Sequence, residues 1–399
     1  MDLSGLLAQL LNGLAGASTL FLVAAGLSLI FGVTRIVNFA HGSFYMLGLF
    51  AAYSCVEQLA GAIGFWPALL LAPLAVGLLG ALVELLLLRR IYHASELLQL
   101  LATFALVLVI KDAALWLWGP EELFGPRAPG LAGAVDLLGR RFPAYDLFLI
   151  AVGPLVLVLL TLLLTRTRWG TLVRAATQDR EMVGALGVNQ AWLFTGVFAL
   201  GALLAGLGGA LQLPREPASL ELDMLTIGAA FVVVVVGGMG SIPGAFVAAL
   251  LIAELKAVCI WLGVVQIGGV AVAFPKLTLV VEFLVMALVL VWRPWGLMGR
   301  PQAAVRAPGA PEYGMIQGGL NGDPRRLMKP IAHEPTTRTG LSHTDGTISM
   351  GRWAPGTATA EFFIMVGDAP EFDADPKANG DNAGFAAFGA EGEADALLV

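Results

Sequence analysis

Apolar residues fill the first 300 positions of this chain almost without interruption. Over the whole sequence of 399 residues, 58% are apolar and only 13% are charged. A typical water-soluble domain carries about 25% charged residues, whereas a chain that places its surface in lipid has far fewer. The composition therefore predicts a polytopic membrane protein.

Nine apolar runs are candidates for crossing a bilayer, which takes roughly 20 residues as a helix. The seventh run is broken early by Gly237–Gly240 and by Pro243, so it is a candidate half-helix or re-entrant segment. We expect an all-α bundle of about eight to nine transmembrane helices over residues 1–300. The nine runs are residues 6–32, 38–62, 65–88, 97–118, 144–165, 191–213, 225–243, 245–264 and 276–293.

Arginines at the ends of these runs predict the orientation of the bundle. If the spans alternate in direction, most of these arginines fall on one side of the membrane, and that side is then cytoplasmic. The opposite loop, 119–143, carries three arginines together with three acidic residues. We therefore expect the N-terminus outside and residue 300 inside. The arginines on the predicted cytoplasmic side are Arg89, Arg90, Arg166, Arg168, Arg174, Arg180, Arg293 and Arg300.

One long polar segment, residues 169–190 (WGTLVRAATQDREMVGALGVNQ), interrupts the apolar sequence. Arg174, Gln178 and Glu181 follow the spacing of one helix face. Such a helix is either simply solvated or docks in a groove on a partner protein. Gly187 would permit a tight turn before the next span.

Charged side chains inside apolar spans are costly in lipid, so each is a candidate functional residue. Their alternative role is to pair between helices and fix the packing of the bundle. Lys111 and Asp112 are adjacent and point to different helix faces, so they need not pair with each other. A proton relay along such residues would indicate a gradient-driven secondary transporter. The candidates are Glu84, Lys111, Asp112, Glu254, Lys256 and Glu282.

Asn38 and His41 lie just beyond Arg35, where the first span ends. A broken helix at this point could line a translocation path. Both residues could equally well cap helix ends. Together with Lys111, Asp112 and Glu254, they form the set of candidate path residues.

The energy source is expected to lie outside the chain. The sequence has no Gly-x-x-x-x-Gly-Lys-Ser/Thr phosphate-binding loop, so we do not expect it to hydrolyse ATP as a P-loop enzyme. No metal-ligand spacing is present either. We expect no cofactor on this chain, and energy from a partner protein or an ion gradient.

Three segments in the first 300 residues carry a family resemblance: Ala25–Val33 with Arg35–Gly42, the polar segment 169–190, and Gly237–Ala245. In this order they resemble permease subunits of ABC importers for branched-chain amino acids. The resemblance implies a homologous second permease subunit, cytoplasmic ATP-binding subunits, an extracytoplasmic solute-binding protein, and a place in the bacterial cytoplasmic membrane. It also implies that segment 169–190 couples the permease to the ATPase. The coupling residues would be Arg174, Gln178, Asp179, Glu181, Gly187 and Val188.

After Arg300 the composition changes abruptly. Residues 301–311 are rich in Pro, Ala and Gly and are predicted to be a linker. Residues 312–399 have the composition of a soluble domain, with short β-type runs such as 361–366. From residue 301 onward there are 7 Lys+Arg and 13 Asp+Glu, so the net charge of −6 resides entirely in this tail, which is expected on the cytoplasmic side.

Four segments of the tail, 315–319, 346–350, 360–364 and 384–389, are similar to bacterial cyclophilin-type peptidyl-prolyl isomerases. They cover roughly the middle half of that fold, which implies an incomplete β-rich segment with open strand edges. Gln317 and Phe363 match positions of the family's substrate groove. The family's catalytic arginine precedes the Met-Ile-Gln-Gly-Gly segment, and no Phe-x-Arg precedes Met315. We therefore expect a transporter subunit with an inactive tail; the alternative is a non-functional chimera.

Overall fold

In the computed structural model the chain forms two compact units, Met1–Pro301 and Gln302–Val399, and each is described by itself. The structure describes residues 3–36, 38–59, 64–92, 94–137, 140–178, 183–184, 187–267, 270–299, 314–319, 332–344, 346–351, 361–366, 368–375 and 385–390. The predicted linker, 301–311, lies outside the described residues.

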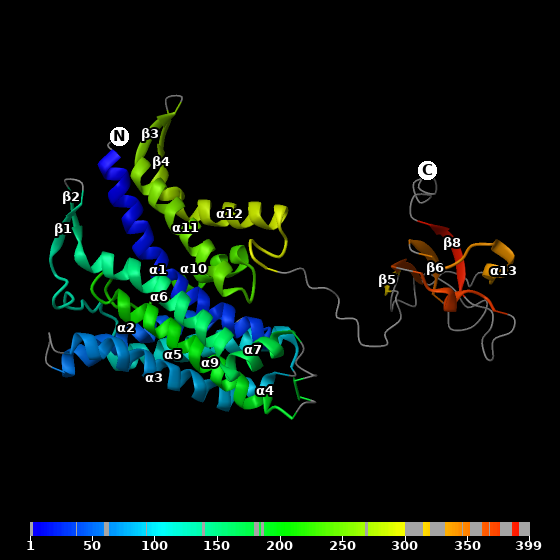
Figure 1. Cartoon of the computed structure of the whole chain (residues 1–399), viewed down its shortest axis with the longest axis horizontal. Helices are drawn as coiled ribbons and strands as arrows, with labels where there is room; N and C mark the ends of the chain where they lie inside the picture. The colour runs from blue at the N-terminus through cyan, green and yellow to red at the C-terminus, as the bar shows by residue number, and fades with distance from the viewer. Residues whose placement is uncertain are drawn as a thin grey trace. The chain divides into compact units, whose positions relative to one another are not determined.

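Helices dominate the first unit, and each of the nine apolar runs coincides with one of them (Figure 1). The helices are α1 (Leu3–Thr34), α2 (His41–Gln58), α3 (Phe65–Val83), the π-helix η2 (Glu84–Leu88), α4 (Arg89–Ile91), α5 (Glu96–Trp118), α6 (Ala144–Arg166), α7 (Arg168–Gln178), α9 (Gln190–Gln212), α10 (Leu222–Gly237), α11 (Ile242–Leu262), the 3₁₀ turn η3 (Phe274–Leu277) and α12 (Thr278–Trp292). Within the described residues, seven are long and apolar enough to cross a membrane: α1, α3 with its extension, α5, α6, α9, α11 and η3 with α12. The predicted all-α membrane fold is confirmed.

The two remaining apolar helices, α2 and α10, are shorter, with 18 and 16 residues. α10 ends at Gly237, and Gly238 then adopts φ +101°, so the helix stops where the glycine run predicted a break. The first turns of α2 and α10 meet, because a Cβ on Gly42 would lie 2.0 Å from the carbonyl oxygen of Asp223. Both helices therefore begin beside each other within the bundle.

α1 and α9 form the centre of the bundle. In their most apolar stretches, 78% of α1 and 72% of α9 is buried, against 22% for α5 and 11% for α12, which lie at the periphery. Small residues allow the central helices to approach closely. A Cβ on Gly26 would lie 2.5 Å from the Gly201 carbonyl oxygen, and one on Gly48 would lie 2.2 Å from that of Gly206.

Two short antiparallel hairpins project from one end of the bundle. They are β1 (Ala134–Leu137) with β2 (Arg140–Pro143), and β3 (Val264–Ile267) with β4 (Val270–Ala273). The sequence patterns predicted a loop for 119–143 and the end of a span at residue 264, so neither hairpin was expected. Figure 1 shows both hairpins and the start of α1 at one end, and α4 and α7 at the other.

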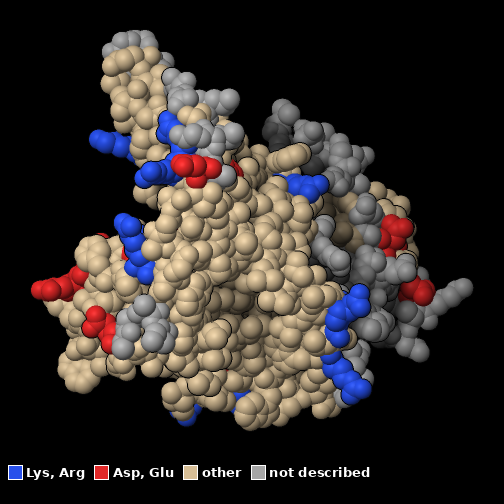
Figure 2. Space-filling view, turned by 60° about the vertical axis from the view of Figure 1, so that its left-hand side comes forward, with Lys and Arg blue, Asp and Glu red and all other residues tan. Residues whose placement is uncertain are grey.

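The outer surface of the helical unit is apolar over a broad area. Figure 2 shows a wide expanse without Lys, Arg, Asp or Glu, with the charged side chains gathered towards its margins. Large exposed apolar side chains on the peripheral helices include Leu78, Leu108, Leu155 and Leu288, each more than half exposed. Such a surface is stable only in contact with lipid or another apolar surface.

The second unit contains a four-stranded antiparallel sheet with strand order β5-β7-β6-β8. The strands are β5 (Gly314–Gly319), β6 (Thr347–Met350), β7 (Glu361–Val366) and β8 (Ala386–Ala390), accompanied by α13 (Thr336–Thr339) and the turn η4 (Pro370–Phe372). Each of the four segments that resemble cyclophilins supplies one strand. β5 and β8 are the edges of this sheet within the described residues.

A buried histidine organises the small core of the second unit. His343 Nδ1 lies 2.7 Å from Asp373 Oδ1, and His343 Nε2 lies 3.0 Å from Ser349 Oγ. Its ring stacks on Phe363, with ring centroids 6.2 Å apart. Ser349 and His343 are buried and Asp373 is partly exposed. The Ser349 hydroxyl donates to the Ala386 carbonyl, so this Ser–His–Asp arrangement holds β6, β8 and a loop together.

Candidate functional site at the α4 and α7 end of the bundle

The amphipathic helix α7 lies across one end of the bundle. Its first turn is capped by Thr167, whose hydroxyl accepts the Gly170 N–H at 3.0 Å. Val173 and Ala176 are 2% and 1% exposed and anchor the helix on the core, while Arg174 is exposed. α7 therefore presents a polar face with Arg174 away from the bundle.

Only part of the predicted coupling surface lies within the described residues. Gln178 ends α7, but its side chain, like the whole of Asp179 and Glu181, lies outside them. Gly187 is exposed and adopts φ +81°, in the left-handed region that glycine favours, which is the turn predicted before the next span. Val188 is partly buried and follows that turn directly.

The three segments that carry the permease resemblance converge at this end. A Cβ on Gly196 in α9 would lie 3.3 Å from the indole nitrogen of Trp169 at the start of α7. A Cβ on Gly32, near the end of α1, would lie 3.8 Å from the methyl group of Thr177 and 3.1 Å from the Cα of Gly240. α7 thus contacts α9 and the end of α1, and the end of α1 in turn lies against the loop between α10 and α11.

The glycine-rich loop between α10 and α11 ties the end of α12 to this site. Gly238 and Gly240 both have positive φ, +101° and +83°. The N–H of Leu297, beyond α12, donates to the Val236 carbonyl at 2.8 Å. Ser241 caps α11 by accepting the Gly244 N–H at 3.1 Å. A displacement of this loop would therefore also shift α10, α11 and the end of α12.

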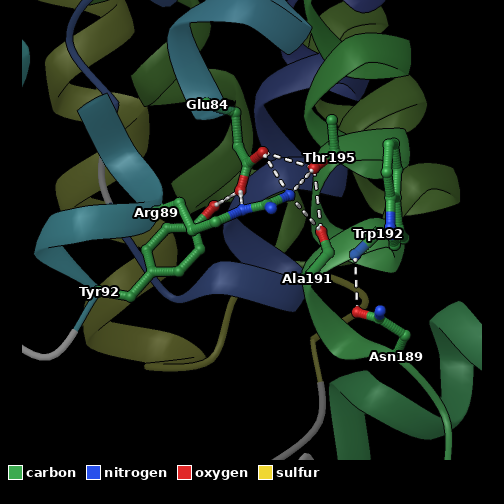
Figure 3. Close-up of polar contacts among 7 residues, drawn as sticks. All are labelled: Glu84, Arg89, Tyr92, Asn189, Ala191, Trp192 and Thr195. Carbon is green, nitrogen blue, oxygen red and sulfur yellow. Dashed lines mark hydrogen bonds and ion pairs between the residues drawn. The ribbon is translucent and has the colours of Figure 1, made fainter. Parts of the chain in front are cut away.

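A polar cluster joins the end of α3 to the start of α9 (Figure 3). Arg89 Nη2 donates to Thr195 Oγ1 at 2.6 Å and to the Ala191 carbonyl at 3.2 Å, and lies 3.4 Å from Glu84 Oε2. The hydroxyls of Thr195 and Tyr92 donate to Glu84 at 2.5 Å and 3.0 Å. The Glu84 carboxylate is fully buried and satisfied by three partners, one of them a cation.

The π-helix η2 explains how this cluster forms. π-Helical hydrogen bonds join residues i and i+5, and such segments often occur at functional sites. Glu84 and Arg89 are five residues apart, at the first residue of η2 and just after its last. On the other side of the cluster, Asn189 caps α9 by accepting the Trp192 N–H at 3.3 Å (Figure 3). The cluster therefore holds the helix turn that directly follows segment 169–190.

Asn38 and His41 lie where the chain turns from α1 into α2. Arg35 there adopts φ +58°, which is uncommon for a residue with a side chain. Asn38 Oδ1 accepts the Ala40 N–H at 3.1 Å, so it stabilises the turn before α2, close to its predicted capping role. His41 instead places Nε2 2.9 Å from the Val23 carbonyl. Asn38 Nδ2 and His41 Nδ1 are buried and have no hydrogen-bond partner within the described structure.

A small pocket separates this turn from the polar cluster. It is bordered by Asn38 and Tyr92, one from each side, and otherwise mostly by apolar side chains of α1, η2 and α9. The lining residues are Ile30, Thr34, Ile36, Asn38, Leu88, Tyr92 and Phe198.

Three of the six charged residues predicted within spans form ion pairs between helices, and Glu84 pairs with Arg89 in the extension of α3. Lys111 of α5 is 3.9 Å from Asp223 of α10, and Lys256 of α11 pairs with Glu282 of α12. Asp112, by contrast, is exposed. Glu254 is partly buried beside Gly13 of α1, ten residues or about 15 Å along that helix from Val23. The structure therefore does not bring Glu254 together with Asn38 and His41.

Two residues of these networks were missed at the sequence level. Asp223 precedes the apolar run predicted to begin at residue 225, and the position of Arg89 at the end of a span indicates only the orientation of the bundle. Asp146 and Arg215, 3.2 Å apart, form a further pair near the hairpin end. Within the described parts of the chain, no group of three His, Cys, Asp or Glu is placed to hold a metal ion.

Seven apolar helices of spanning length within the described residues, with charged side chains paired inside the bundle and an amphipathic helix across one end, define a multi-pass membrane protein. The family model for the branched-chain amino acid transport system permease component matches residues 9–290. The chain belongs to this family. Residues 309–390 match the model for cyclophilin-type peptidyl-prolyl cis-trans isomerases.

Curated relatives extend over nearly the whole permease. The high-affinity branched-chain amino acid transport system permease protein BraD of Pseudomonas aeruginosa is 30% identical over 306 residues, covering 74% of this chain and 96% of its own length. The LivH permease proteins of Salmonella typhimurium and Escherichia coli are each 26% identical over 310 residues, with the same coverage. No solved structure matches the chain.

Proposed function

We propose that the chain is a permease subunit of an ATP-driven importer for branched-chain amino acids or related small solutes. The observation that carries this proposal is the convergence of α7, the end of α1 and the Gly237–Ala245 loop at one end of a membrane bundle. The names of the relatives, which are branched-chain amino acid permeases, support the substrate class.

In this proposal the α4 and α7 end faces the cytoplasm of a bacterium, in its cytoplasmic membrane. Arg89, Arg166 and Arg174 all lie at this end, and basic residues favour the cytoplasmic side. The hairpin end then faces outward, where a solute-binding protein delivers the substrate. The tail, which follows α12, is cytoplasmic.

Coupling would act through segment 169–190. α7 offers an exposed polar face to a groove on an ATP-binding subunit, and its buried face packs on the bundle. Closure of the ATPase pair would displace α7, and its neighbours on α9 and α1 would transmit the displacement. Arg89 and Thr195 fix the first turn of α9 to α3, so the displacement reaches the rest of the bundle.

The partners in this proposal are two ATP-binding subunits, a homologous second permease and an extracytoplasmic solute-binding protein. The alternative, a gradient-driven secondary transporter, needs titratable groups connected into a relay. The candidate relay residues are Lys111, Asp112 and Glu254. Lys111 is held in an ion pair with Asp223, Asp112 is exposed on α5, and Glu254 lies beside Gly13 of α1. Because no described hydrogen bond or ion pair joins the three, the structure favours the ATP-driven proposal.

The test is uptake of labelled leucine into vesicles that contain the full chain with its ATP-binding subunits, second permease and binding protein. We expect uptake to require ATP and to persist when a protonophore collapses the proton gradient. Uptake that a protonophore abolishes at constant ATP would favour the gradient-driven alternative. Assembly of the complex without any leucine uptake would refute the substrate assignment.

A further inference from the structure

Asp112 is the exception among the acidic residues of the seven long apolar helices. The described side chains of these helices include five carboxylates: Glu84, Asp112, Asp146, Glu254 and Glu282. Three of them are at least 94% buried and paired with a basic side chain, and Glu254 is partly buried. Asp112 alone is exposed, and it has no hydrogen-bond or ion-pair partner in the described structure.

The surroundings of Asp112 make its exposure significant. It lies on α5, six residues or about 9 Å before the helix end at Trp118. Residues three and four positions away on the same helix surface are apolar and exposed: Leu108 by 52%, Val109 by 64%, Leu115 by 42% and Trp116 by 84%. An ionised carboxylate in such a stripe cannot face hydrocarbon cheaply, so this side of α5 borders water or protein.

The neighbouring lysine does not neutralise Asp112. Lys111 is oriented towards the bundle, where it lies 3.9 Å from the buried carboxylate of Asp223. Since one positive charge is shared with that buried acid, Asp112 leaves a net negative charge on the α5 surface. A cationic group that approaches this surface is attracted to it.

We propose that Asp112 receives the α-ammonium group of the transported amino acid, where α5 borders a water-filled path beside the second permease subunit. This inference rests on the proposed function. An ammonium group has three N–H donors that match the acceptor oxygens of a carboxylate. Leu108, Val109 and Leu115 supply an apolar surface for an aliphatic side chain. The Asp112 surface therefore suits both the charged and the apolar part of such a substrate.

The first part of the test measures transport by the complete importer with substitutions at position 112. Asp112→Asn keeps the shape but removes the charge, and should lower leucine uptake by about tenfold or more, because a charge-assisted hydrogen bond is lost. Asp112→Glu, which keeps the charge, should retain most of the uptake. The assembly of all subunits, measured by co-purification, should be unchanged in both variants.

The second part measures access of water to position 112. In a chain whose Cys55 and Cys259 are replaced by Ala, Asp112→Cys should react with a water-soluble methanethiosulfonate reagent. Val109→Cys, on the same surface and 64% exposed, keeps the Asp112 carboxylate, so leucine should slow its reaction. Leu284→Cys, on the 54% exposed face of α12, is the matched control and should not react. Because this readout does not depend on uptake, it distinguishes failure at Asp112 from failure of the proposed function.

Three results would overturn the inference. No reaction of the Asp112→Cys variant, together with normal uptake by Asp112→Asn, would place this face in lipid. Loss of the second permease from the Asp112→Asn complex would mean that Asp112 pairs with a basic residue of that subunit. Reaction of the Val109→Cys variant without slowing by leucine, in a complex whose unsubstituted form transports leucine, would mean that water but not substrate reaches the surface around Asp112.

Discussion

Arg89 Nη2 lies 2.6 Å from the hydroxyl oxygen of Thr195, although 106 residues separate them in the sequence. Both groups also contact the fully buried carboxylate of Glu84, so one ion pair and its hydrogen bonds hold the extension of α3 against α9. Since α9 begins directly after segment 169–190, this contact determines where that segment joins the bundle.

Removal of the Arg89 side chain should strongly destabilise the permease. Arg89→Ala would leave the Glu84 charge buried without its cation, which costs about 3–5 kcal/mol. Thermal unfolding of the detergent-solubilised protein would measure the loss. The adjacent Arg90→Ala is the control, because Arg90 is exposed, and should change stability little. Equal stability of both variants would contradict the structural role assigned to Arg89.

The exposed face of α7 should affect coupling rather than folding. Arg174→Ala removes an exposed side chain from the proposed contact with the ATPase, and we expect uptake per ATP hydrolysed to fall about tenfold, as for a central interface residue. Val173→Ala, on the buried face, should reduce the amount of folded protein instead. Unchanged coupling in Arg174→Ala would remove this residue from the contact.

The close approach of α2 and α10 should make Gly42 intolerant of a side chain. A Cβ at this position would lie 2.0 Å from the Asp223 carbonyl oxygen, so Gly42→Ala must push the two helices apart, at a cost of about 1–3 kcal/mol. Gly16→Ala is the matched control: a Cβ there has no atom within 4 Å, and alanine favours the helix by up to about 1 kcal/mol. The midpoint temperature of thermal unfolding should therefore fall for Gly42→Ala and rise for Gly16→Ala.

Truncation after Arg300 should leave transport intact. The helical unit has its own core, and the described buried clusters of the two units share no residue. Vesicles with residues 1–300 should take up leucine as fast as vesicles with the full chain. Uptake by the truncated chain alone would show that the tail impairs the transporter.

The tail should show no isomerase activity. No Phe-x-Arg segment precedes Met315, and we expect the full-length protein not to accelerate cis–trans isomerisation of a proline peptide. Measurable turnover in a protease-coupled assay would contradict this expectation.

Composition and apolar run length predicted the helices well, because a bilayer demands about 20 apolar residues of any span. Start and end positions were harder where polar groups decide them. Asn38 forms a turn that delays the start of α2 to His41. The hairpin of β3 and β4 was missed although Gly268-Gly269 between two β-branched runs is a turn signal.

The site was predictable only in part. The polar segment and its exposed Arg174 were visible as a pattern of polar residues, since solvation of such a segment depends on local sequence alone. The pairing of Arg89 with Thr195 depends on a π-helix and on contact between distant helices, which no local spacing encodes. Asp223 lies two residues before the apolar run predicted to begin at residue 225, so the run does not include it, and its pairing with Lys111 depends on contact between two helices.

The start of α2 and α10 beside each other has a consequence for the polarity of the bundle interior. His41 contacts the carbonyl of Val23, well inside the 32-residue helix α1, so both short helices begin in the interior. The first turn of any helix leaves backbone N–H groups without intrahelical acceptors. The two helix ends therefore place backbone polar groups, the His41 ring and the Asp223 carboxylate inside an otherwise apolar core. Lys111 of α5 pairs with that carboxylate, so the same two helix ends also fix the position of a peripheral helix.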